Sequence, residues 1–341
     1  MSQMMIKSPS SGYGDSFAFR LNTGVGTGNF ALPLPEYTLD DSASPSYDFI
    51  VDWGDGGPTD NITAYNDAAR IHAYPVAGEY IVTITGLCEG WSFDSEFVVS
   101  LANEAWFVEI INWGDIGVIE WTFSFYNMYL ETISATDAPD LSSLYSTSLA
   151  SMFEYTYLGT CDLSAWDVSL ITSFNSMFGA CYGTTYGIAD WDVSAGTDFE
   201  FMFYDSPFNE DISGWDVGNG NGFRAMFSGA TAFNQDIGGW DMSSCGDMVL
   251  MLEGTSSFDQ DISGWQIQSA DSMGAILKAP IGLSVANYDL LLNAWSLLTH
   301  DHSTYFPFQC DQNYTITTSQ AARDILTGAP NNWTITDLGG I

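Results

Sequence analysis

The chain has 341 residues, in which 43 acidic residues oppose only 6 lysines and arginines, so its formal net charge is −37. A field of this sign repels nucleic acid and anionic membrane surfaces, which argues against partners of either kind. Apolar residues make up 46% of the chain and aromatic residues 15%, a composition that excludes a disordered acidic tail and predicts two or three folded units.

The excess of acid leaves two interpretations of the chemical setting open. Close carboxylates repel one another, so a saline or Ca²⁺- and Mg²⁺-rich environment would stabilise the folded chain by screening. The alternative is that the charge serves surface solubility and needs no particular ion.

Cysteine usage and hydropathy give only negative information. The five cysteines form no C-x-x-C pair, so we interpret them as small buried apolar residues and expect no zinc finger. No segment approaches about 18 uninterrupted apolar residues, so no membrane-spanning helix is predicted. The first residues, “MSQMMIKSPSSGYGDSF”, contain no apolar signal core.

The N-terminal part of the chain is predicted to be all β. Residues 1–14 are expected to form an N-terminal arm, and 15–88 to contain short strands separated by turns, among them “SFAFRLN”, “YDFIVDWGDGG” and “HAYPVAGEYIVTITG”. Evenly spaced strands within fewer than 100 residues predict a small β-sandwich. Asp52 and Asp55 flank the turn at Gly54 and are interpreted as turn caps in preference to metal ligands.

Residues 146–280 repeat with a period of about 25 residues. The clearest copies begin at Phe208, Phe233 and Phe258, and the Met-Phe pairs follow the same period as the tryptophans. A fixed period of this size predicts a solenoid, in which each unit buries its apolar side against its neighbours. The residues expected to stack are Trp166, Trp191, Trp215, Trp240, Trp265, Phe153, Phe178, Phe203 and Phe227.

One copy of the repeat suggests how each coil folds. Trp215, Asp216 and Val217 alternate as a short half-buried strand should, with the aspartate outward. In “FRAMFSGATAFN”, apolar residues from Phe223 to Ala230 have the i, i+3, i+4, i+7 spacing of a short helical turn. The predicted fold class is therefore mainly β with short helices.

Residues 281–341 have a different pattern, which predicts a C-terminal cap over the open end of the solenoid. Apolar residues at helical spacing indicate a helix over 285–298. A second helix is expected at 319–326, with Thr318 as N-cap and Gly328 as stop, followed by a last strand in “NWTITD”.

Two motifs near the N-terminus resemble a known domain. The “VDWGDG” turn at 51–56, followed by “IHAYPVAGEYIVTITG” at 71–86, resembles the PKD-type immunoglobulin-like domain. This resemblance implies an Ig/PKD-like β-sandwich for 15–88.

The repeats resemble the BspA-type leucine-rich-repeat surface proteins through “FNxDISGWDV” and “MF”. “INWGD” at 111–115 with “ISATDAPDLSSL” at 133–144 is similar to that family's lead-in, so 89–145 would be the N-terminal cap of the solenoid. “ANYDLLLNAWSLL” with “AARDILTGAPNNWTITDLGG” is similar to its helical C-terminal cap. The resemblance implies a leucine-rich-repeat-like solenoid and a role in adhesion or surface recognition.

Acidic residues recur at fixed phases of the repeat and are the main candidates for ion binding. They fall into two columns if the coils stack at about 5 Å. We interpret them as caps of their own turns, with bound Ca²⁺ as the alternative, because Ca²⁺ prefers oxygen ligands. The residues concerned are Asp211, Asp236, Asp261, Asp216 and Asp241.

Other polar candidates are interpreted as structural. Asn209 and Asn234 are expected to satisfy backbone groups within the bends in preference to contacting a ligand. The sequence His300-Asp301-His302 offers two imidazoles but no third ligand at a fixed spacing, so a solvated loop is preferred to a metal site. His72 in the H-x-Y strand is expected to be structural.

No catalytic motif is found, and acids in repeat register favour structure over glycoside hydrolysis. The sequence therefore predicts a non-enzymatic structural or adhesive surface protein. With no export signal in view, we expect an exposed virion component of a phage-like particle, such as a fibre, spike or capsid decoration. A bacterial cell-surface adhesin and a glycan-cleaving tail protein are the alternatives. The expected partners are structural proteins of a particle, a cell-surface receptor or glycan, or further copies of the chain.

Overall fold

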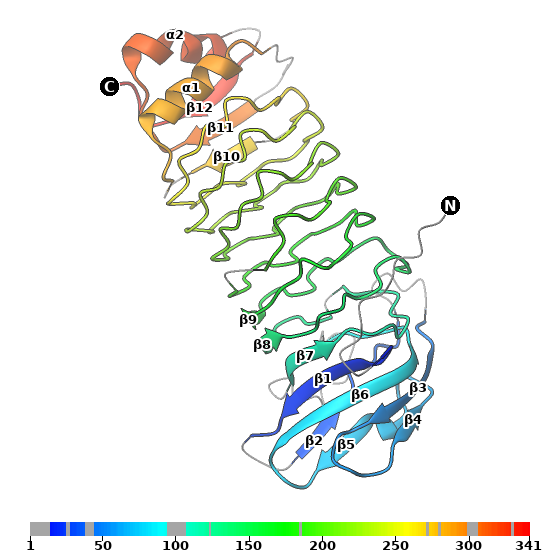
Figure 1. The fold of residues 1–341 in the computed structure, drawn as a ribbon. Coiled ribbons are helices and arrows are strands. Elements are labelled where there is room, and N and C mark those ends of the chain that lie inside the picture. The colour runs from blue at the N-terminus through cyan, green and yellow to red at the C-terminus, as the bar shows by residue number, and fades with distance from the viewer. Residues whose placement is uncertain are drawn as a thin grey trace. The chain divides into compact units, whose positions relative to one another are not determined.

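The computed structural model describes residues 14–24, 28–37, 44–93, 107–122, 124–183, 186–270, 273–278, 281–298, 306–328 and 331–341. The chain divides into two compact units, Met1–Asp167 (unit 1) and Val168–Ile341 (unit 2). Strands and turns dominate both units, so the predicted mainly β class is confirmed (Figure 1).

Unit 1 contains one large sheet and one small sheet. Seven strands pair in the order β4-β3-β6-β1-β7-β8-β9, and β2 pairs with β5. A short 3₁₀ helix, Ala68–Arg70, precedes β5. The strands are β1 Phe17–Asn22, β2 Gly28–Ala31, β3 Tyr47–Asp52, β4 Asp60–Ile62, β5 Ile71–Tyr74, β6 Glu79–Cys88, β7 Phe107–Asn112, β8 Tyr129–Ile133 and β9 Tyr157–Thr160.

Strand β1 joins two kinds of pairing within this sheet. It pairs antiparallel with β6 on one side and with β7 on the other, while β7, β8 and β9 pair in parallel. Strand β1 thereby covers the edge of β7 that would otherwise be open. This keeps the N–H and C=O groups of that edge from pairing with another chain. The sheet crosses the boundary expected between residues 88 and 89, so strands of the predicted sandwich and of the predicted solenoid lead-in share one sheet.

The tight turn after β3 depends on a glycine. Gly54 has φ +76°, and a Cβ added there would lie 2.3 Å from the backbone oxygen of Ile81. Asp52 caps the turn by accepting the N–H of Gly54 at 2.9 Å, and Asp55 accepts the N–H of Gly57 at 2.8 Å. Both aspartates therefore act as the predicted turn caps.

In unit 2, backbone hydrogen bonds join segments about 25 residues apart, and successive coils lie side by side (Figure 1). The N–H of Phe203 donates to the carbonyl of Met226, and the N–H of Phe227 donates to that of Met251, both at 2.9 Å. Along each Met-Phe segment, every second backbone N–H donates to a carbonyl of the next coil. The N–H groups between them donate to the carbonyl three residues earlier in the same coil and so form turns.

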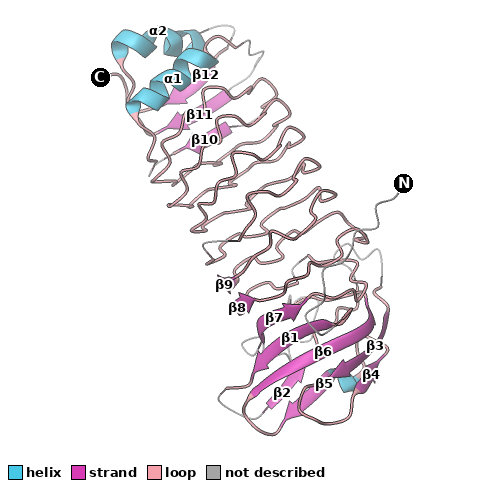
Figure 2. Cartoon of the chain, in the orientation of Figure 1, coloured by secondary structure: helices cyan, strands magenta, loops and turns pink. Residues whose placement is uncertain are grey.

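The secondary structure expected for one repeat was wrong in both places. The segment from Phe223 to Ala230 is a series of turns carrying the coil-to-coil bonds, with Ala225 and Gly229 at positive φ. Trp215–Val217 is not a strand, although its tryptophan and valine are buried and its aspartate is exposed. Figure 2 accordingly draws the described repeats mostly as loops. A run of turns places apolar residues at the same spacing as a helix, which is why the pattern misled.

Aromatic side chains stack in columns inside unit 2. The rings of Phe178 and Phe203 lie 5.9 Å apart at 1°, and those of Phe203 and Phe227 lie 5.6 Å apart at 11°. Within one coil, the rings of Phe203 and Phe208 are only 3.8 Å apart. The core is therefore continuous from coil to coil and closely packed within each coil.

Three of the repeat tryptophans are held by their indole N–H groups. Trp240 donates to the carbonyl of Ile212 at 3.2 Å, and Trp265 donates to that of Ile237 at 2.9 Å. Trp215 makes the equivalent bond to Ile188. Each of these buried rings thus satisfies its polar atom on the preceding coil, which fixes one coil's position on the next.

The end of unit 2 replaces turns with helices. Strands β10, β11 and β12 pair in parallel, and a helix follows each of the first two. The expected helix over 285–298 is present, while Thr318 lies within α2, whose N-cap is Thr315. The elements are β10 Met273–Leu277, α1 Val285–Trp295, β11 Phe306–Cys310, α2 Ile316–Thr327 and β12 Trp333–Thr336.

A pair of glycines tests the turn after β3. Gly54 and Gly56 both have positive φ, but a Cβ at Gly56 would meet nothing within 4 Å. Gly56→Ala should cost about 1–2 kcal/mol from its left-handed backbone alone, and Gly54→Ala at least about 2 kcal/mol more because of the added clash. Equal midpoints of the two variants in urea denaturation would contradict this close approach.

Trp240 tests the repeat core. Trp240→Ala should lower the free energy of unfolding by about 3–5 kcal/mol, because it opens a cavity and removes the bond to Ile212. Leu297→Ala serves as the control, since Leu297 is 82% exposed and its loss should change stability by less than about 0.5 kcal/mol. Chemical denaturation measures both, and a Trp240→Ala variant as stable as the control would refute the packing.

Candidate binding surfaces

All nine side chains expected to stack are buried, none more than 5% exposed. In unit 1, Phe153 stacks on Phe125 at 5.7 Å, and Trp166 lies edge-on to Trp113 at 5.1 Å. The others, all in unit 2, are Trp191, Trp215, Trp240, Trp265, Phe178, Phe203 and Phe227. These residues form the interior and offer no surface to a ligand.

The five repeat aspartates, for which bound Ca²⁺ was the alternative to turn capping, are all exposed, and each caps a turn. Asp211 accepts the N–H of Ser213 at 3.0 Å, and Asp241 accepts that of Ser243 at 2.9 Å. Asp216, Asp236 and Asp261 make the same bond two residues ahead. The preferred interpretation, capping through the local backbone, is what the geometry shows.

These caps have a pH dependence of known sign. Hydrogen bonds from the hydroxyl and N–H of Ser213 lower the pKa of Asp211, and Ser243 lowers the pKa of Asp241 in the same way. An aspartate whose folded pKa lies below its unfolded value of about 3.9 stabilises the fold above that pH. This contribution is lost as the pH falls through the lowered pKa.

Amide side chains form a second column, which joins successive coils. The Oδ1 of Asn209 accepts the N–H of Asn234, and the Oδ1 of Asn234 accepts the N–H of Asp259, both at 2.9 Å. Asp259 continues the series by accepting the N–H of Ser284, the N-cap of α1, at 2.7 Å. The asparagines therefore satisfy backbone groups, as expected, but those groups lie on the next coil and not within the bend of the same coil, where they were expected.

The few basic residues are committed to partners. Of the six lysines and arginines, Lys7 lies outside the described residues. Arg70 donates to the carbonyl of Leu32 at 2.9 Å. The other four make ion pairs: Arg20 with Glu79 and Glu109, Arg224 with Asp247, Lys278 with Glu253, and Arg323 with Asp337. The surface field in the described parts of both units is thus set by unpaired acids.

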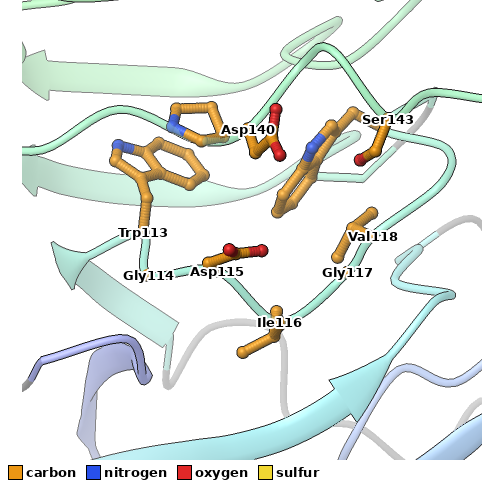
Figure 3. A pocket seen from close by; sticks show the side chains of 10 residues that line it. Trp113, Gly114, Asp115, Ile116, Gly117, Val118, Asp140 and Ser143 are labelled. Atoms are coloured by element: carbon orange, nitrogen blue, oxygen red, sulfur yellow. The ribbon is translucent and has the colours of Figure 1, made fainter. Parts of the chain in front are cut away.

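One small cavity lies beside the “INWGD” segment of unit 1 (Figure 3). Trp113, Asp115 and Asp140 are among its lining residues, and Asp137 holds the adjoining backbone by accepting the N–H groups of Trp113 and Gly114 at 3.0 and 2.8 Å. Its volume of about 10 Å³ leaves room for no more than one water. It cannot hold an organic substrate.

A larger hollow in unit 1 is shallow and open. Its volume is about 380 Å³, and Glu36, Tyr47 and Tyr65 are among its lining residues. Tyr47 is fixed there, because its hydroxyl donates to the carbonyl of Pro35 at 2.7 Å.

Histidine and cysteine chemistry adds no metal site in the described ranges. His72 lies 3.0 Å from Asp55 and stacks on Trp53, a structural position as expected, whereas His300-Asp301-His302 lies outside those ranges. The cysteines are free and buried, as expected: Cys88, Cys161, Cys181, Cys245 and Cys310. Burial raises the pKa of Cys245 to about 12, so its thiol is inert at neutral pH. No cluster of three or more potential ligands occurs in the described chain.

Exposed tyrosines are the surface feature that sequence reasoning missed. Tyr129 and Tyr157 occupy paired positions on β8 and β9, and their rings stack 4.6 Å apart at 6°. Tyr126 and Tyr155 form a second contact, edge to face at 5.6 Å. The signal was present as “MYL” and “YTYL”, two segments in which exposed tyrosines alternate with buried residues.

Comparison with known proteins finds one family. Residues 121–219 and 184–284 match the family described as Mycoplasma protein of unknown function, DUF285. Together the matches span 121–284, less than half of the chain, so the similarity concerns the repeat region. No curated protein and no solved structure matches the chain. Among the described residues, no helix is long and apolar enough to cross a membrane.

Calcium should add nothing specific to stability. The capping oxygens of Asp216 and Asp241 are bonded to backbone N–H groups, so we expect equal melting temperatures in CaCl₂ and in NaCl of the same ionic strength. Differential scanning calorimetry measures this. A rise of several degrees in Ca²⁺ alone, reversed by a chelator and abolished in Asp216→Asn/Asp241→Asn, would instead place ions on this column.

Proposed function

We propose that the chain is a non-enzymatic structural or adhesive surface protein, exposed on a phage-like particle, with a bacterial cell surface as the alternative location. In this proposal an Ig/PKD-like β-sandwich spaces or attaches the molecule. A leucine-rich-repeat-like solenoid with a helical C-terminal cap then presents the binding surface. The partners are structural proteins of the particle or a receptor or glycan on a cell.

The observation that carries the proposal is the coil-to-coil hydrogen-bond ladder of unit 2. Successive coils repeat the same bonds, as when Phe203 donates to Met226 and Phe227 donates to Met251. A stack of this kind presents the same surface many times over, which suits contact with an extended partner and provides no deep cleft for a substrate.

The roles of the polar residues support a function without catalysis. Acids in repeat register, such as Asp211 and Asp241, cap turns, and Asn209 and Asn234 join coils. These groups are accounted for by the fold itself. A glycoside hydrolase would need two carboxylates about 5–9.5 Å apart across a groove and free to act on a sugar.

The match to the DUF285 family supports the relation of the repeats to BspA-type proteins. It bears on 121–284, where the tryptophans and Met-Phe pairs recur. The proposed surface role comes from that resemblance together with the ladder, since the matched family is itself described as of unknown function.

Microscopy and a glycan assay test the proposal together. Antibodies against the purified chain should label particles or cell surfaces in native source material. The purified chain should be retained on host surface glycans or proteins without releasing oligosaccharide. Labelling confined to the interior of cells would refute the surface role, and released oligosaccharide would favour the glycan-cleaving alternative.

A further inference from the structure

Three exposed tyrosines and the half-buried Tyr126 form a patch on unit 1, which we call the tyrosine patch: Tyr126, Tyr129, Tyr155 and Tyr157. Tyr129 is 51% exposed, Tyr155 46% and Tyr157 39%. Thr156, between Tyr155 and Tyr157, is fully buried, so the two tyrosines on either side of it face solvent. Large aromatic side chains at this exposure are the residues most often found at the centre of protein interfaces.

The geometry of the patch favours one kind of ligand. The rings of Tyr129 and Tyr157 lie face to face at 6°, so their inner faces cover each other and one face of each ring remains outside the pair. An outer ring face could stack on a sugar as well as on a planar cation, so the charge beside the rings decides between them. A planar guanidinium can extend such a stack, since arginine packs flat against aromatic faces.

An uncovered carboxylate lies on the same face of β8. Burial along this strand alternates, with Tyr129 and Glu131 exposed and Leu130 buried between them. The residue opposite Glu131 on β9 is Gly159, where a Cβ would lie only 2.0 Å from the backbone oxygen of Glu131. The close approach of the two strands thus requires glycine, and no side chain from position 159 covers Glu131.

The charge of the chain selects a basic partner. The net charge is −37, and each basic residue in the described ranges is bonded within its own unit. Within the described ranges, no basic side chain is left to pair with Glu131, so a basic partner complements its charge. Charge complementarity of this kind also raises the rate of association.

We propose that the tyrosine patch and Glu131 bind arginine side chains of a basic protein segment. In the complex, a guanidinium stacks on an outer face of the Tyr129–Tyr157 pair and its N–H groups donate to the Glu131 carboxylate. This inference rests on the proposed function, because it names the class of partner that the surface would engage.

Binding of labelled peptides to the full chain tests the inference. The probes are a short fluorescein-labelled peptide of alternating arginine, glycine and serine, and the same peptide with lysine in place of arginine. Fluorescence anisotropy is measured at about physiological ionic strength, which screens long-range attraction to the acidic surface. The arginine peptide should bind about five-fold more tightly than the lysine peptide, because lysine cannot stack as a plane.

Variants of the patch separate stacking from charge. Tyr129→Ala/Tyr157→Ala should weaken binding of the arginine peptide about five-fold or more, and Tyr129→Phe/Tyr157→Phe should keep it, since the ring faces remain. Glu131→Gln should weaken both peptides. Tyr145→Ala is the matched control, because Tyr145 is 59% exposed in the same unit, and it should change nothing. Circular dichroism of each variant verifies folding.

Two outcomes would overturn the inference. One is equal affinity for the arginine and lysine peptides with no effect of the tyrosine variants, which would assign binding to overall charge. The other is that a neutral oligosaccharide binds the chain and that this binding is lost in Tyr129→Ala/Tyr157→Ala and in Tyr129→Phe/Tyr157→Phe. That result would assign the patch to a sugar. If the peptides fail while the chain is still retained on native surfaces, only this inference fails. If retention itself is absent, the proposed function fails.

Discussion

The alternating use of backbone N–H groups is the interaction on which the repeat region depends. In each Met-Phe segment of unit 2, one N–H closes a local turn and the next donates to the neighbouring coil. The pattern requires left-handed backbone at residues such as Phe201 and Ala225, which costs about 1–2 kcal/mol each. Coil-to-coil bonds and stacked phenyl rings offset that cost, so a coil is stable only beside its neighbours.

Each unit handles an exposed end of its parallel strands in its own way. In unit 1, β1 pairs antiparallel with β7 and covers an edge. In unit 2, the strands β10, β11 and β12 continue in parallel, but helices α1 and α2 replace the turns between them. The amide column carries over into this region through Asp259, which bonds the N-cap Ser284. Burial raises the pKa of Asp259, but the hydrogen bonds that it accepts from Ser284 and Asn287 together outweigh burial, so the pKa is lowered.

This construction separates residues that hold the fold from residues free to bind. Acids at fixed repeat phases look like ligands in the sequence, yet Asp236 and Asp261 are occupied by their own turns. Tyr129 and Tyr157 leave large parts of their rings in solvent, beside a carboxylate that Gly159 leaves uncovered. The surface proposed for binding therefore lies where the repeat pattern is least regular.

The sequence by itself determined the period, the buried tryptophans and phenylalanines, the turn caps at Asp52 and Asp55, and the two C-terminal helices, because these follow from local spacing and turn chemistry. Only the tertiary structure decided that Phe223 to Ala230 forms a ladder of turns instead of a helix, since apolar spacing is the same in both. Only the tertiary structure showed that β1 pairs with β7 and that Tyr129 stacks on Tyr157. These contacts depend on which backbone groups meet between distant segments, and the sequence of a single segment does not encode that pairing.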